Sequence, residues 1–153
     1  DWQASILQPV PYAVAPPFQE LAELSSQRRD HDPVWQDALR RCVAMVGGLT
    51  AVDGATIASA EYEVLAFGAK IGRRQGSPRV EQVMVTEPIV GSSAVMMNSA
   101  QLGGTRHIAA AQFVHDQHDS MALVASQDGR FTVLVWSPCE NMVHAHRVEA
   151  LLL

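Results

Sequence analysis

The segment 103–107, Gly-Gly-Thr-Arg-His, combines the features of an anion-binding site. It precedes the apolar-periodic run 108–114, which predicts a helix that begins at this segment. The first four amides of a helix lack partners inside it, and the peptide dipoles leave about half a positive charge there. The glycines let a ligand approach closely, and Arg106 and His107 are basic. The segment therefore predicts a phosphate site. The simpler alternative is that Thr105 caps the helix and the two basic residues are only solvated.

A second segment, Asp53-Gly54-Ala55, lies within an apolar run that is typical of a strand. An Asp-Gly pair between apolar residues is first of all a turn. The functional alternative is a carboxylate that holds a divalent metal or takes a proton from a sugar hydroxyl, with small neighbours that leave room for the ligand. The spacing alone does not choose between the two interpretations.

Three motifs in order resemble the diadenylate cyclase domain of the DisA N-terminal type. They are Asp53-Gly54-Ala55, then Gly104-Thr105-Arg106-His107 at a helix start, then Val124-Ala-Ser126-Gln-Asp-Gly129. The run 67–71, Phe-Gly-Ala-Lys-Ile, resembles the divergent sensor-like relatives of that family, the DACNV group. The resemblance covers about residues 47 to 137.

This resemblance implies a central mixed β-sheet flanked by helices, and two ATP molecules bound face to face between two domains of a homo-oligomer. In an active member each 3′-hydroxyl attacks the α-phosphate of the other ATP with the help of Mg²⁺ or Mn²⁺. By position, Asp53 corresponds to the catalytic, metal-binding carboxylate. The residues expected to bind nucleotide or phosphate are Gly54, Ala55, Gly104, Thr105, Arg106, His107 and Ser126.

The chain departs from the family at one catalytic position. The family signature is Arg-His-Arg, whereas here the third position is Ile108. The departure removes a cationic fork that could neutralise charge on the transferring phosphate, a loss on the order of a hundredfold or more in rate. Binding of a nucleotide can survive the loss of this second arginine.

Three functions follow from these motifs. The first is a sensor domain that binds ATP or a cyclic dinucleotide without turning it over. The second is an active diadenylate cyclase that tolerates Ile108 and makes cyclic di-AMP from two ATP. The third is an interaction domain that has kept the fold and lost the ligand.

Periodicity and turn residues divide the chain into elements around these motifs. Four of the eight prolines lie in residues 1–17, which predicts an extended N-terminal arm before a single domain over 18–153. Residues 87–101 have no clear assignment. Beyond the helix that follows residue 104, the expected helices are 18–24, 33–46 and 144–153, and the expected strands are 49–59, 62–70, 80–86, 121–126 and 130–136. This mixture predicts an α/β fold of the mixed α+β kind, with a sheet packed by helices.

Composition and net charge limit the classes of binding partner that we expect for this chain. The chain has 153 residues, 48% of them hydrophobic, and a formal net charge of −5, which is ordinary for a globular domain and disfavours long nucleic acids and anionic membranes. No apolar run reaches the ~20 residues of a membrane span. The cysteines, Cys42 and Cys139, have no paired spacing, which is typical of a cytoplasmic protein. The apolar ending 150–153 is consistent with a helix that continues into a larger protein.

Two further clusters have both a functional and a plain interpretation. The segment 115–119, His-Asp-Gln-His-Asp, could hold a metal ion or could be a solvated polar turn at a helix end. Arg73, Arg74 and Arg79 could form a lid over phosphates or belong to a solvated loop over 72–79.

Overall fold

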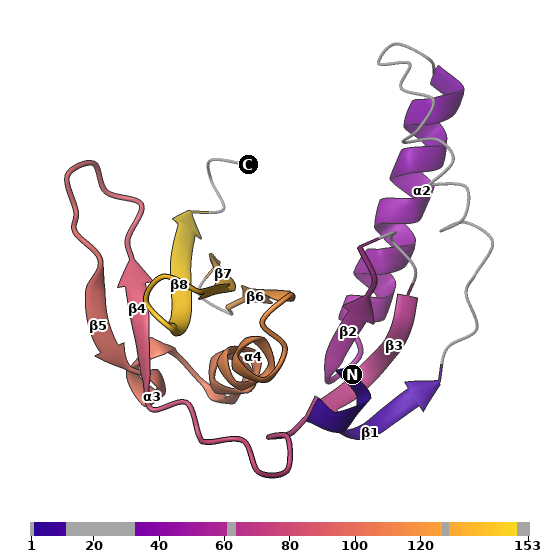
Figure 1. Ribbon diagram of the computed structural model, residues 1–153. Helices are drawn as coiled ribbons and strands as arrows, with labels where there is room; N and C mark the ends of the chain where they lie inside the picture. The colour runs from indigo at the N-terminus through magenta and orange to yellow at the C-terminus, as the bar shows by residue number, and fades with distance from the viewer. Residues whose placement is uncertain (1, 12–32, 61–63, 127–128, 150–153) are drawn as a thin grey trace. The chain divides into compact units, whose positions relative to one another are not determined.

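The structure, a computed structural model, describes residues 2–11, 33–60, 64–126 and 129–149 (Figure 1). The chain forms two compact units, one made of Asp1–Ser5 with Ile71–Leu153 and the other of Ile6–Lys70. Within the predicted arm, Trp2–Ser5 form a 3₁₀ helix, η1, and Ile6–Pro11 form strand β1. The arm boundary expected at residue 17 and the helix expected over 18–24 lie outside the described residues.

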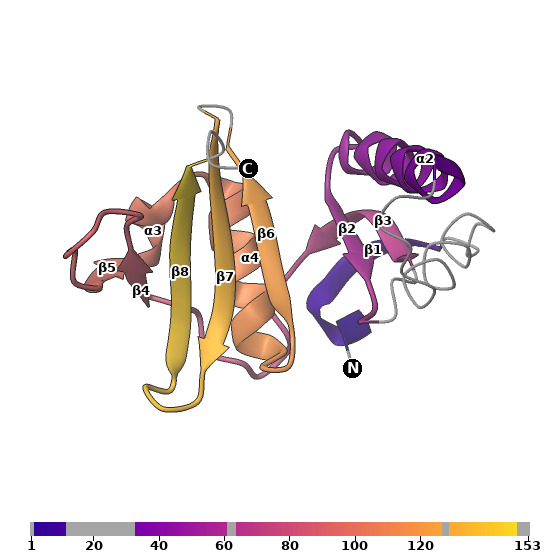
Figure 2. The same ribbon diagram turned by 90° about the horizontal axis from the view of Figure 1, so that it is seen from above.

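The larger unit contains a five-stranded sheet with helices on one of its faces (Figure 2). Its strands are β4 (Gln82–Thr86), β5 (Val95–Asn98), β6 (Met121–Ala125), β7 (Arg130–Ser137) and β8 (Met142–Glu149). Their order is β5-β4-β8-β7-β6, in which β4 and β8 pair parallel and the other neighbours pair antiparallel. Helices α3 (Ser99–Leu102) and α4 (Thr105–Asp116) cover the sheet. The mixed α+β class predicted from the sequence is confirmed.

The hydrophobic core of this unit lies between α4 and the sheet. Helix α4 contacts β6, β7 and β8, and alternate strand residues point toward it because side chains in a strand alternate between faces. Leu134 in β7 and Val114 in α4 are completely buried. The core comprises Val80, Val83, Val85, Leu102, Ala110, Ala111, Val114, Val124, Leu134, Val143 and Ala145.

The helix predicted over 144–153 is wrong over its described part, because these residues belong to strand β8. Val143 and Ala145 are buried, while His144 and His146 lie on the opposite face at half-buried positions. That alternation has the two-residue period of a strand, and β8 is paired on both sides, with β4 and β7. Pairing along both edges decided the conformation of a segment whose own pattern was ambiguous.

The segment left unassigned over 87–101 contains strand β5 and the short helix α3. The side-chain oxygen of Asn98 accepts a hydrogen bond from the amide of Ala100, so Asn98 caps α3. The buried hydroxyl of Ser99 donates to the carbonyl of Val80 at 2.7 Å. These polar contacts, rather than apolar periodicity, define the segment.

The smaller unit contains helix α2 (Pro33–Thr50) and strands β2 (Ala55–Ala58) and β3 (Val64–Ile71). These two strands and β1 form a three-stranded sheet of order β1-β3-β2. Strands β2 and β3 are antiparallel neighbours and form a hairpin. The predicted helix end at residue 46 is wrong, because α2 continues through Gly47 and Gly48. Its last turn is held by a bond from the Thr50 hydroxyl to the Gly47 carbonyl at 2.9 Å. The strand expected from residue 49 therefore starts only at Ala55.

Among the described residues, no helix is long and apolar enough to cross a membrane.

Candidate functional site

The predicted helix start is confirmed, and it lies at the junction of α3 and α4. Gly103 ends α3, and Gly104 is the N-cap residue of α4, which begins at Thr105. In the part of the chain that the structure describes, no side chain caps this end of α4. Among the described residues, the amides of Thr105 and Arg106 have no hydrogen-bond partner. The start of α4 therefore offers bare amides together with the positive end of the helix dipole.

The basic residues at this helix start point in different directions. Arg106 is exposed, as is Thr105, and its guanidinium forms no ion pair with any described residue. His107 is only 6% exposed. Arg106 is thus available to a ligand in solution, whereas the imidazole of His107 faces the interior.

His107 lies between the strand ends and Gly103. Its Nε2 is 3.4 Å from the Ser126 hydroxyl and 3.4 Å from the Thr132 hydroxyl. On the other side of the ring, a Cβ at Gly103 would stand 2.4 Å from Nδ1, so only glycine fits there. The structure therefore brings Ser126 to the imidazole of His107, and adds Thr132, which no motif had indicated.

The remaining predicted site residues, Asp53, Gly54 and Ala55, lie in the smaller unit at the start of β2. The Asp53 side chain is 82% exposed, and its Oδ2 lies 2.5 Å from the Lys70 Nζ. A metal ion at this carboxylate would have to compete with that ammonium group. Gly54 packs against the backbone of Gly68, where a Cβ would meet the Gly68 carbonyl carbon at 2.4 Å. The Asp-Gly pair is thus a turn and also an exposed carboxylate.

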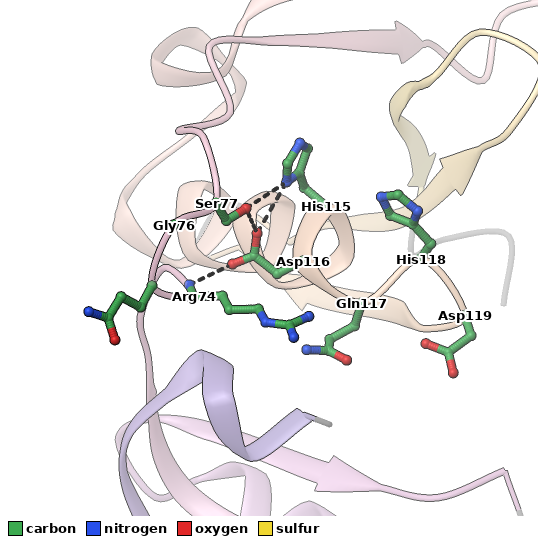
Figure 3. Close-up of a pocket in the computed structure, with 9 residues that line it drawn as sticks. Arg74, Gly76, Ser77, His115, Asp116, Gln117, His118 and Asp119 are labelled. Carbon is green, nitrogen blue, oxygen red and sulfur yellow. Dashed lines mark hydrogen bonds and ion pairs between the residues drawn. The ribbon is translucent and has the colours of Figure 1, made fainter.

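The other end of α4 anchors the loop over 72–79 (Figure 3). The Arg74 amide donates to Asp116 Oδ2 at 2.8 Å, and the Ser77 hydroxyl donates to Asp116 Oδ1. Asp116 is the last residue of α4, whose 12 residues make a rod about 18 Å long. Because Arg74 is held at the end of α4 opposite to Thr105, the lid interpretation is wrong for Arg74.

Gln112 completes this anchor from the preceding turn of α4. Its amide nitrogen donates to the Pro78 carbonyl at 3.1 Å and to Asp116 Oδ1 at 2.9 Å. Its amide oxygen accepts from the Val80 amide at 3.1 Å. A buried glutamine with all of these bonds made fixes the path of the loop into β4.

These contacts also set the charge state of Asp116. Burial by itself raises the pKa of this carboxyl, but hydrogen bonds to the charged form outweigh burial and hold the pKa below its ordinary value. The donors are the Arg74 amide and the side chains of Ser77, His115 and Gln112. Asp116 is therefore an ionised structural anchor at neutral pH.

Asp116→Asn is expected to lower the free energy of unfolding at neutral pH by about 1–3 kcal/mol, because a charged acceptor in a buried network is lost. A carboxyl with a lowered folded pKa stabilises the protein above its unfolded pKa, and this stabilisation disappears as the pH falls through the folded value. The difference between wild type and variant should therefore shrink as the pH falls below about 5 and through the lowered pKa of the folded state. Urea unfolding of wild type and Asp116→Asn at a series of pH values measures this difference in the free energy of unfolding.

Asp119→Asn is the matched control, since it removes the same charge from an exposed position three residues away. It should change stability by less than about 0.5 kcal/mol. A wild-type to Asp116→Asn difference that stays constant across the pH series would contradict the assigned role of Asp116.

The imidazoles of the segment 115–119 are held by aromatic contacts. His118 stacks on Trp136 with ring centroids 3.7 Å apart, and His115 meets the edge of the same indole at 5.6 Å. Over the part of the chain that the structure describes, no three or more His, Cys, Asp or Glu residues are grouped to hold a metal ion. Asp116 thus anchors the loop at the end of α4, while His118 and Asp119 form an exposed polar turn, as the plain interpretation expected.

No protein-family model, no curated protein and no solved structure matches this chain. The two features with the clearest chemistry are the bare start of α4 beside Arg106 and the exposed carboxylate of Asp53.

Proposed function

We propose that this chain is a nucleotide-binding sensor domain related to the diadenylate cyclases of the DisA N-terminal type, close to the DACNV group. Its ligand is ATP or a cyclic dinucleotide, and its place of action is the cytoplasm. The proposal includes a homo-oligomer and a role as one domain of a larger signalling protein. Turnover of the nucleotide is not part of it.

The observation that carries the proposal is the uncapped start of α4. The amides of Thr105 and Arg106 have no partner among the described residues, and the Arg106 guanidinium is exposed beside them. Amides at a helix N-terminus favour an anion, and a guanidinium forms two parallel hydrogen bonds to phosphate oxygens. With a formal net charge of −5, the chain favours a small anionic ligand over a polyanion. A phosphate group of a nucleotide meets these requirements.

Two features favour binding over catalysis. Ile108, which is half-buried, stands where the family signature has its second arginine, so no guanidinium is supplied there. Lys70 is paired with Asp53, the carboxylate expected to hold Mg²⁺ or Mn²⁺ in an active enzyme. When bound, such a metal would activate the attacking hydroxyl, and Asp53 is the one residue predicted to hold it. Because Lys70 offsets the negative charge of Asp53, this carboxylate attracts a metal cation less strongly.

Isothermal titration calorimetry with ATP and with cyclic di-AMP tests the proposal. Arg106→Ala is expected to weaken binding by about 10- to 100-fold, because a charge-assisted contact to phosphate is lost. Arg40→Ala removes an exposed arginine from α2 and should leave the affinity unchanged. If wild type binds neither ligand, or if Arg106→Ala binds as tightly as wild type, the proposal is wrong.

Incubation with ATP and Mg²⁺ or Mn²⁺, followed by chromatography, separates the sensor from an active cyclase. We expect no cyclic di-AMP. Product that forms with wild type and disappears with Asp53→Asn would show that catalysis survives Ile108, and the sensor proposal would then be withdrawn in favour of a cyclase.

A further inference from the structure

Three polar side chains from different elements meet beneath the start of α4. The His107 Nε2 lies 3.4 Å from the Ser126 hydroxyl at the end of β6 and 3.4 Å from the Thr132 hydroxyl in β7. Thr132 is 2% exposed and His107 is 6% exposed, whereas Ser126 is half-buried. The imidazole therefore links an interior hydroxyl to one that solvent can reach.

Thr132 is the most firmly held of the three. It is the third residue of β7, directly opposite Val124 on β6 and Arg147 on β8. A β-branched side chain in a strand has a restricted χ1 angle, so the direction of its hydroxyl is set by the sheet. The Thr132 hydroxyl is thus a hydrogen-bonding partner with a fixed position beside the His107 imidazole.

The Ser126 hydroxyl is less restricted than that of Thr132. The Ser126 backbone is held by hydrogen bonds, but its hydroxyl can rotate. Its amide donates to the Arg130 carbonyl at 2.8 Å, and its carbonyl accepts from the Gly129 amide at 3.2 Å. The hydroxyl of a serine can donate one hydrogen bond and accept two. Whether the Ser126 hydroxyl donates to a ligand or accepts from it depends on whether the His107 Nε2 accepts from this hydroxyl or donates to it.

The His107 Nε2 is either a hydrogen-bond donor or an acceptor, depending on the tautomer of the ring. A protonated Nε2 donates to a hydroxyl, and an unprotonated Nε2 accepts from one. The buried Thr132 hydroxyl needs a partner and can bond Nε2 in either state, so it competes with the Ser126 hydroxyl for this single nitrogen. Gly103 allows the ring to stay in place, since any side chain there would collide with Nδ1.

We infer that Thr132 is a positioning residue of the phosphate site: through the His107 imidazole it sets the direction of the Ser126 hydroxyl toward a bound phosphate. This inference rests on the proposed nucleotide-binding function. Thr132 itself does not touch the ligand. Its buried hydroxyl acts only by orienting the ring, and the ring acts by orienting the serine.

Thr132→Val tests the inference, because it removes the hydroxyl and keeps the branched shape. ATP binding, measured by calorimetry, is expected to weaken about three- to tenfold, the equivalent of one hydrogen bond. Thr132→Ser restores a hydroxyl and should recover most of the affinity. Thr86→Val is the control, since Thr86 is a half-buried strand residue of β4 paired with His146 rather than with His107.

The ¹⁵N chemical shifts of the His107 ring give a readout that does not need a ligand. They should change in Thr132→Val and stay near the wild-type values in Thr132→Ser and Thr86→Val. Unchanged ring shifts in Thr132→Val would overturn the inference, and so would unchanged ATP affinity in a wild type that binds. If wild type binds no nucleotide, the proposed function fails and this positioning role fails with it, whatever the ring shifts show.

Discussion

Gly54→Ala is expected to destabilise the smaller unit by about 3 kcal/mol or more. Gly54 has a φ of 125°, a conformation that residues with a side chain rarely adopt. A Cβ at this position would also lie 2.4 Å from the Gly68 carbonyl carbon and 2.7 Å from its oxygen. Because both contacts are with backbone, relief requires the β2 and β3 hairpin to separate.

Hydrogen exchange followed by mass spectrometry measures this effect by region. Peptides from α2, β2 and β3 should exchange faster in Gly54→Ala. Gly47→Ala is the matched control, because a Cβ there meets nothing within 4 Å and the position lies in helix α2. The control should stabilise the helix by about 0.5–1 kcal/mol, so the same substitution is expected to have opposite signs at two positions of one unit. Equal exchange in wild type and Gly54→Ala would contradict the packing of Gly54 on Gly68.

Leu134→Ala is expected to lower the free energy of unfolding of the larger unit by about 2–5 kcal/mol. Leu134 is completely buried in β7 and belongs to the core that α4 covers. Its neighbours in adjacent strands, Ala122 and Ala145, are fixed by the pairing register, so the cavity left behind would collapse only in part.

Urea unfolding monitored by circular dichroism measures this loss. Leu123→Ala is the control, because Leu123 is 59% exposed on β6. It should change stability by less than about 1 kcal/mol. Comparable losses from Leu134→Ala and Leu123→Ala would show that the core does not lie between α4 and the sheet.

Local chemistry was sufficient to predict several elements. Glycines before a threonine and an apolar-periodic run gave α4 its correct start, and β-branched runs placed β3, β6 and β7 within two residues of their observed bounds. The hairpin of β2 and β3 also follows from such runs. These elements are set by residues next to one another in the chain, so their signals are visible without a fold.

Other elements depend on distant partners. The segment 142–149 has apolar residues that fit a helix or a strand, and it became β8 because β4 and β7 both pair with it. The glycines at 47 and 48 look like a helix end, yet α2 continues to Thr50. A glycine weakens a helix by only about 1 kcal/mol, which packing of the rest of the helix readily offsets.

The site shows the same division. The sequence alone determined that residues 103–107 begin a helix and bring bare amides and a basic side chain to one place, because those properties belong to consecutive residues. Only the tertiary structure decided that Arg106 faces solvent while His107 turns inward to Ser126 and Thr132. It also decided that Asp116 anchors the loop over 72–79 at the opposite end of α4. Those contacts join residues from separate elements, and their geometry exists only once α4 has packed on the sheet.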